Sequence, residues 1–132
     1  MRPTGDMTTT TDEVIDRFNR AFQERDAALL EDIIAPDCVM ESIQPAPDGT
    51  RYEGYDASFS SWKALIDDPT SHFEVEDVHT GGEWALIRWR YLWGPGSDHS
   101  VRGVNVMRVV DGKIVEAAGY SKTAPTVAAL EG

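Results

Sequence analysis

The sequence predicts a single α+β domain in which three N-terminal helices pack inside a curved, mostly antiparallel sheet. Two observations lead to this fold class. Apolar residues recur mainly at helical spacing as far as about residue 68, and beyond it they alternate with a period of two. Three helices cannot cover both faces of the sheet that the later residues would form. The sheet is therefore expected to curl round the helices into an open cone.

Residues 12–25 are predicted to form the first helix. The four residues 10–13 (TTDE) match a capping box, and their acids lie where the positive end of a helix dipole favours negative charge. Val14, Phe18 and Phe22 then recur at helical spacing. These residues would give the helix one apolar face to pack against the sheet.

A second, short helix is predicted after Asp26, which can cap it, with Leu30 and Ile33 facing inward. Pro36 is expected to end this helix, because its ring removes an N–H and clashes with the preceding turn. Residues 37–44 then show the pattern of a first strand.

The third helix is predicted after Gly54, with Trp62 and Ile66 on its apolar face. Four strands follow, at about 72–80, 83–93, 100–110 and 113–122. The Gly-Gly pair at 81–82 and the Asp-Gly pair at 111–112 are typical of two-residue hairpin turns. The last four strands should therefore form an antiparallel meander.

The composition limits the kinds of partner. Twelve Lys and Arg residues against 23 Asp and Glu give a net charge of −11, which repels phosphate backbones and anionic lipid, so we expect no nucleic-acid and no membrane partner. No apolar run approaches the roughly 20 residues of a membrane span, and the N-terminus lacks the apolar stretch of a signal peptide, which predicts a cytoplasmic protein. We predict polar tails over 1–11 and 124–132, flanking one domain over 12–123.

The side chains that usually bind metals or attack substrates are isolated in this sequence. Cys38 is the only cysteine and has no basic neighbour in the sequence, so we interpret it as a buried, inert thiol. His72, His79 and His99 form no pair at metal-binding spacing. We therefore expect neither a metal nor a cofactor.

Four short runs resemble one known family: FQERD at 22–26, APDCV at 35–39, YEGY at 52–55 and VVDGKIVE at 109–116. In order and spacing they are similar to the nuclear transport factor 2-like superfamily, and within it to the SnoaL-like proteins, which include polyketide cyclases and relatives of ketosteroid isomerase. The resemblance spans about residues 12–123. It implies a cystatin-like cone, a homodimer and a deep, mostly apolar pocket for a small-molecule ligand, without a cofactor.

Matching the family's catalytic positions leaves few groups that could transfer a proton. Where ketosteroid isomerase has its base, tyrosine and acid, this chain has Ser42, Phe18 and Asn105. In ketosteroid isomerase the base removes a proton, and the tyrosine and the acid stabilise the resulting enolate by hydrogen bonds. Of the three matching residues in this chain, only Asn105 could still donate such a bond to a carbonyl. Arg88 matches the arginine of the related epoxide hydrolases. The end of the final strand, where cyclases place an acid, has no carboxylate over 118–122.

The candidate catalytic residues are therefore Asn105, Ser42 and Glu41. Glu41 is the carboxylate nearest to the expected base, but strand alternation places it opposite Met40 and Ser42. The candidate ligand-binding residues are Phe18, Met40, Trp62, Arg88, Trp89, Tyr91, Met107, Tyr120 and Lys122.

The run 84–93 allows two orientations of its strand. The apolar pattern places Ile87, Trp89 and Tyr91 inward and Arg88 outward, whereas matching the family points Arg88 into the pocket. A shift of one residue reverses every side chain. On the strand at 100–110, arginines and valines alternate on the outer face, which suits a two-fold dimer interface or a solvated sheet.

Three functions fit these observations. The first is a cofactor-free acid–base enzyme (isomerase, cyclase, dehydratase or hydrolase) acting on a small cyclic or polyketide-like metabolite. The second is a non-catalytic ligand-binding protein, and the third is a dimerisation module whose aromatic residues fill their own cavity. A structure with no cavity larger than a few water molecules would exclude the first two.

Overall fold

The structure is a computed structural model and describes residues 10–43, 48–93 and 100–122. Apart from Thr10 and Thr11, the two predicted tails lie outside these residues, as does His99. The elements, in chain order, are α1 (Thr11–Gln23), the 3₁₀ helix η2 (Ala27–Leu30), β1 (Ile34–Glu41), β2 (Arg51–Glu53), α2 (Tyr55–Asp67), β3 (Ser71–Gly81), β4 (Trp84–Trp93), β5 (Ser100–Val110) and β6 (Lys113–Ser121).

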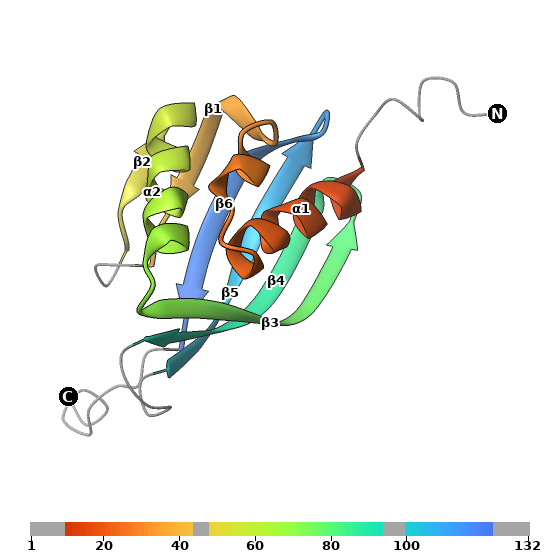
Figure 1. Cartoon of the computed structure of the whole chain (residues 1–132). Coiled ribbons are helices and arrows are strands. Elements are labelled where there is room, and N and C mark those ends of the chain that lie inside the picture. The colour runs from red at the N-terminus through yellow and green to blue at the C-terminus, as the bar shows by residue number, and fades with distance from the viewer. Residues whose placement is uncertain (1–9, 44–47, 94–99, 123–132) are drawn as a thin grey trace.

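The six strands form one curved sheet in the order β2-β1-β6-β5-β4-β3. β1 and β6 pair in parallel, and every other neighbouring pair is antiparallel. The sheet curves round α1 and α2, which both lie on its concave side (Figure 1). On the edge strand β3, a bulge between Val75 and Asp77 helps to bend the strand. The predicted α+β fold with a curved, mostly antiparallel sheet is confirmed.

The prediction of three N-terminal helices is wrong, because only two α-helices form in the described residues. Asp26 caps the predicted second helix through Ala28 N–H, but η2 has only four residues. The chain enters the sheet early, since Ile34 already pairs with Ile114 of β6. Pro36 consequently lies within β1, in the stretch where the register shifts and a missing N–H is tolerated.

Helix α1 begins as its sequence predicts. The Thr10 side chain accepts a hydrogen bond from the Glu13 backbone, and the Glu13 side chain accepts one from the Thr10 backbone, which completes the capping box. The side chain of Thr11 also donates to the carbonyl of Gly82, between β3 and β4. The start of the helix is thus attached to the sheet that it covers.

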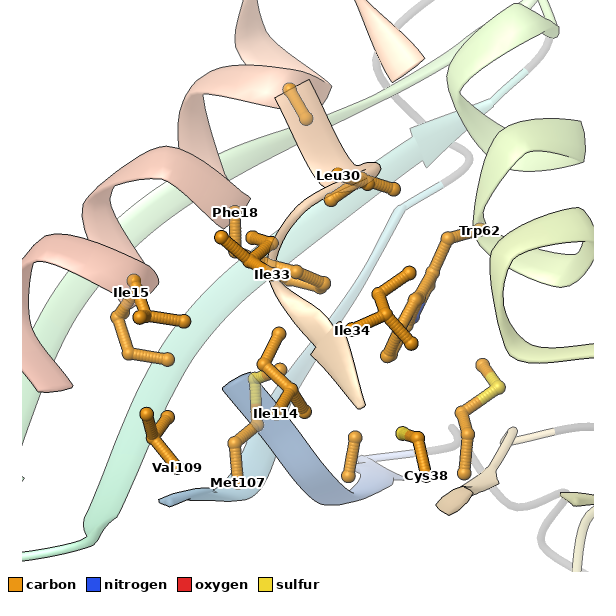
Figure 2. Packing of buried hydrophobic residues seen from close by; sticks show 14 of the residues in the cluster. Ile15, Phe18, Leu30, Ile33, Ile34, Cys38, Trp62, Met107, Val109 and Ile114 are labelled. Atoms are coloured by element: carbon orange, nitrogen blue, oxygen red, sulfur yellow. The ribbon is translucent and has the colours of Figure 1, made fainter. Parts of the chain in front are cut away.

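The hydrophobic core lies between the two helices and the concave face of the sheet. Ile15 and Phe18 of α1 extend toward β5, the strand that carries Met107 and Val109, and Trp62 projects from α2 toward Ile34 (Figure 2). All five of Ile15, Phe18, Trp62, Met107 and Val109 are at least 97% buried. The side chain of Phe18 meets that of Trp62 edge to face, with 5.1 Å between ring centroids. This packing joins α1 to α2.

The outer face of the sheet carries paired charges and half-buried valines. Arg102 of β5 binds Glu76 of β3 at 3.0 Å, and Arg108 binds Glu83 at 2.9 Å. Val104 and Val106 lie between these arginines, half-buried. The homodimer that this face could support stays a prediction. Among the described residues, no helix is long and apolar enough to cross a membrane.

Candidate functional site

A cavity of about 90 Å³ opens between α1, α2 and the concave face of the sheet. A water molecule needs about 10–15 Å³ of such space, so there is room for roughly six or more waters or one small organic molecule. Five aromatic side chains line it and touch one another in sequence: Trp62, Phe18, Phe22, Phe73 and Trp89. Three of the four contacts are edge to face, a favourable arrangement of rings. The cavity is larger than a few water molecules, so the aromatic residues do not fill it.

Asn105 and Trp89 provide the best-defined polar contact at the cavity. The indole Nε1–H of Trp89 donates to Oδ1 of Asn105 at 3.2 Å. An indole nitrogen can only donate, so the amide must present its oxygen to Trp89. The Nδ2 group, which carries the two hydrogens, is then the end of the amide that can bind a ligand. The cavity therefore offers a hydrogen-bond donor at this point.

Glycines on β5 and β6 make room for this pair. Gly103 lies opposite Trp89 in the β4–β5 register, and a Cβ atom there would overlap the indole ring. Gly119 lies opposite Asn105 in the β5–β6 register, and a Cβ atom there would come within 3.1 Å of the Asn105 Oδ1. Each of the two side chains therefore packs directly against the backbone of a glycine.

Ser42 lines the cavity where the chain leaves β1. Its Oγ accepts a hydrogen bond from the Thr50 backbone at 3.3 Å, and its own N–H donates to the Thr50 carbonyl at 2.9 Å. These bonds close the connection between β1 and β2. The serine hydroxyl is thus engaged by this turn.

Among the described residues that line the cavity, Glu41 is the only ionisable one, and its carboxylate is already paired. It lies 3.6 Å from the guanidinium of Arg51, which also binds Glu53 at 2.7 Å. The Glu41 side chain is 44% exposed, and Glu41, Arg51 and Tyr120 also line a groove on the outer face of the sheet. Met40, the preceding residue, is buried on the inner face. The carboxylate therefore belongs to the outer face, as strand alternation predicts.

Seven of the candidate residues come together at the cavity: Phe18, Met40, Glu41, Ser42, Trp62, Trp89 and Asn105. The other five lie outside it. Met107 is fully buried in the core, and Tyr91 packs against Phe73 with 4.6 Å between ring centroids. Arg88, Tyr120 and Lys122 are exposed. The apolar pattern of β4 gave the right orientation, because Ile87 and Trp89 are buried.

Further cavity residues were not predicted to bind a ligand. They are Asn19, Phe22, Ile43, Leu65, Phe73, Val75, Ile87, Ala117, Ala118 and Gly119. Phe22 lies one helical turn after Phe18, so the spacing already placed it on the inner face of α1. Asn19 had no such indication, because a polar residue beside an apolar face is usually solvated. No group of three metal-ligating side chains occurs in the described ranges.

Cys38 is fully buried, and this burial raises the pKa of its thiol above the ordinary value of 9.0. We expect the folded protein to react slowly with a disulfide-exchange reagent at pH 8, and the reaction to accelerate when urea unfolds the chain. The neutral thiol is favoured in the folded state, so its contribution to stability is complete below pH 9 and is lost as the pH rises above it. A Cys38→Ala variant should lack this loss in a pH series of urea denaturations. Rapid labelling of the native protein would contradict the prediction.

Comparisons with known proteins agree on the fold. A family model of the SnoaL-like domain matches residues 15–117. An NTF2-like protein of unknown function from Mesorhizobium loti is 48% identical, with a TM-score of 0.82 over 86% of this chain and 91% of its own. No curated protein matches significantly.

Two more distant structures are similar in fold alone. A putative polyketide cyclase from Sinorhizobium meliloti is 24% identical, with a TM-score of 0.66 over 81% of this chain and 93% of its own. A putative ketosteroid isomerase from Kribbella flavida is 18% identical, with a TM-score of 0.72 over 91% of this chain and 84% of its own.

Proposed function

This chain belongs to the SnoaL-like domain family, and on that premise we propose that it binds a small molecule in the cavity between α1, α2 and the sheet. The single observation that carries the proposal is the composition of the cavity wall, which is mostly apolar with a few polar groups. Five aromatic rings and several aliphatic side chains form its wall, with hydrogen-bonding groups at a few points. This is the usual composition of a small-molecule site.

The state of the candidate proton carriers supports binding over acid–base catalysis. A general base must reach the proton that it removes. Glu41, the one carboxylate residue in the described part of the cavity lining, is paired with Arg51, and Ser42 bonds to the β1–β2 turn. Asn105 has no proton to transfer at ordinary pH, although it can hold a ligand by a hydrogen bond. The cavity thus has groups for recognition in place, but its carboxylate is engaged elsewhere.

Titration with toluene, followed by the NMR signal of the Trp89 indole N–H, tests the proposal. We expect a saturable shift of this signal, because an apolar ring that enters the cavity must contact Trp89. Leu65→Trp, which fills the cavity from α2, should weaken binding at least about tenfold. The matched control is Ala64→Trp, at an exposed position of the same helix, which should leave binding unchanged. If toluene shifts no cavity signal, or if Leu65→Trp binds it equally well, the cavity is not the ligand site.

A further inference from the structure

Resting on the proposed function, we propose that the cavity selects an uncharged, largely apolar molecule that carries a hydrogen-bond acceptor such as a carbonyl oxygen. In this account Nδ2 of Asn105 donates to that acceptor. Trp89 is the positioning residue, since its indole N–H holds the amide in the orientation that presents Nδ2. The class of ligand therefore follows from which end of the Asn105 amide, its NH₂ group, is left to face the ligand.

The amide of an asparagine would by itself bind donors and acceptors equally well, because it carries both an oxygen and an NH₂ group. Here the oxygen is already engaged by Trp89 at 3.2 Å. Turning the amide would bring its NH₂ group against the indole N–H, so that two donors faced each other. Trp89 would then be buried without a partner, which is costly. The donor orientation is the one that satisfies both residues.

The surroundings of Trp89 keep this arrangement in place. The residue is 97% buried, and its ring meets Phe73 edge to face at 5.2 Å. Gly103 lies opposite it on β5, and any added side chain there would collide with the ring. Asn105 packs against Gly119, where an added Cβ atom would lie 3.1 Å from its Oδ1. Because close packing fixes both partners, the donor position is set before a ligand arrives.

The charges around the cavity select for a neutral ligand. Arg88 is exposed, and Arg90 hydrogen-bonds through its guanidinium to Ser100 at 3.1 Å, so neither cation lines the cavity. The carboxylate of Glu41 is occupied by Arg51 on the other face of the sheet. From the described side chains, a charged ligand would gain no free partner of opposite charge to replace its hydration, which is strongly unfavourable in an apolar site.

Matched probes of similar shape test the proposal by NMR titration. Acetophenone carries a carbonyl, α-methylstyrene replaces its oxygen with a CH₂ group, and benzoate replaces its methyl with a charged oxygen. Asn105→Leu removes the donor at similar volume. We expect this variant to weaken acetophenone at least about tenfold and to leave α-methylstyrene within about twofold. Benzoate should bind the unaltered protein at least about tenfold more weakly than acetophenone does.

A second variant separates positioning from simple packing. Trp89→Phe keeps an aromatic ring but frees Oδ1 of Asn105, so the amide can turn. Indole, a neutral ring that only donates, should then bind at least about fivefold more tightly than it binds the unaltered protein, while acetophenone loses affinity. A purely structural role for Trp89 would weaken both ligands alike. This variant keeps the test valid if Asn105→Leu does not fold.

The outcomes distinguish the two proposals. If no probe binds, the proposed function itself fails. Acetophenone and α-methylstyrene could both bind, with Asn105→Leu weakening both equally or neither. In that case the cavity remains a ligand site, but Asn105 does not recognise a hydrogen-bond acceptor. Benzoate binding as tightly as acetophenone would overturn selection for a neutral ligand. An equal loss of indole and acetophenone in Trp89→Phe would overturn the positioning role.

Discussion

Gly103→Ala is expected to lower the free energy of unfolding by about 3 kcal/mol, which is large for the addition of one methyl group. The new Cβ atom would overlap the Trp89 ring and would lie 2.5 Å from the backbone carbonyl oxygen of Tyr120. The ring is packed against Phe73, and the carbonyl belongs to the neighbouring strand, so neither can move at low cost. Because Trp89 would be displaced, its hydrogen bond to Asn105 should be lost as well.

Gly81→Ala is the matched control, because an added Cβ atom at Gly81 meets nothing within 4 Å. It should leave stability within about 0.5 kcal/mol or raise it slightly, since alanine restricts the unfolded chain. Urea denaturation followed by far-UV circular dichroism measures both variants. If Gly103→Ala is as stable as Gly81→Ala, the sheet does not hold Trp89 as described.

Arg25→Ala is expected to cost about 3 kcal/mol of stability, although the residue lies at the surface. Its guanidinium donates to the carbonyls of Ile66 and Asp68 at the end of α2, and to that of Ser71 at the start of β3. One side chain therefore donates to three backbone carbonyls, at a helix end where positive charge is favourable. Removing it would loosen the junction of three elements.

The planar fork of donors is essential to this role, so Arg25→Lys should recover less than half of the loss. Arg20→Ala is the control, because Arg20 pairs with Glu24 on the exposed side of α1, where solvent screens the pair and its loss should change stability little. Thermal unfolding of the three variants measures the difference. Equal stability of Arg25→Ala and Arg20→Ala would show that the contacts of Arg25 contribute little.

Most of the fold could be predicted because its patterns are local. The strand predicted at 100–110 has those bounds in the structure, and the strand predicted at 113–122 ends one residue earlier. Period-two alternation and two-residue turns are both visible in short stretches of sequence. The early start of β1 could not be predicted in this way, since it depends on pairing between Ile34 and Ile114, eighty residues apart in the chain.

The candidate site, like the fold, could be predicted from the sequence only in part. Alternation along β4 is a local pattern, so it could place Trp89 inward and Arg88 outward. The contact between Trp89 and Asn105 depends on the register of β4 against β5, and the space for it depends on Gly103 and Gly119. The sequence alone identified Asn105 as a possible donor. It could not show that a tryptophan fixes the direction in which the amide donates.

A crystal structure of the protein soaked with acetophenone tests most directly whether this cavity holds a neutral ligand whose acceptor binds Asn105. We predict that its ring lies among Phe18, Trp62 and Trp89, with the carbonyl oxygen within hydrogen-bonding distance of the Asn105 Nδ2. A ring bound on the outer face of the sheet, or a carbonyl directed away from Asn105 inside the cavity, would contradict the account.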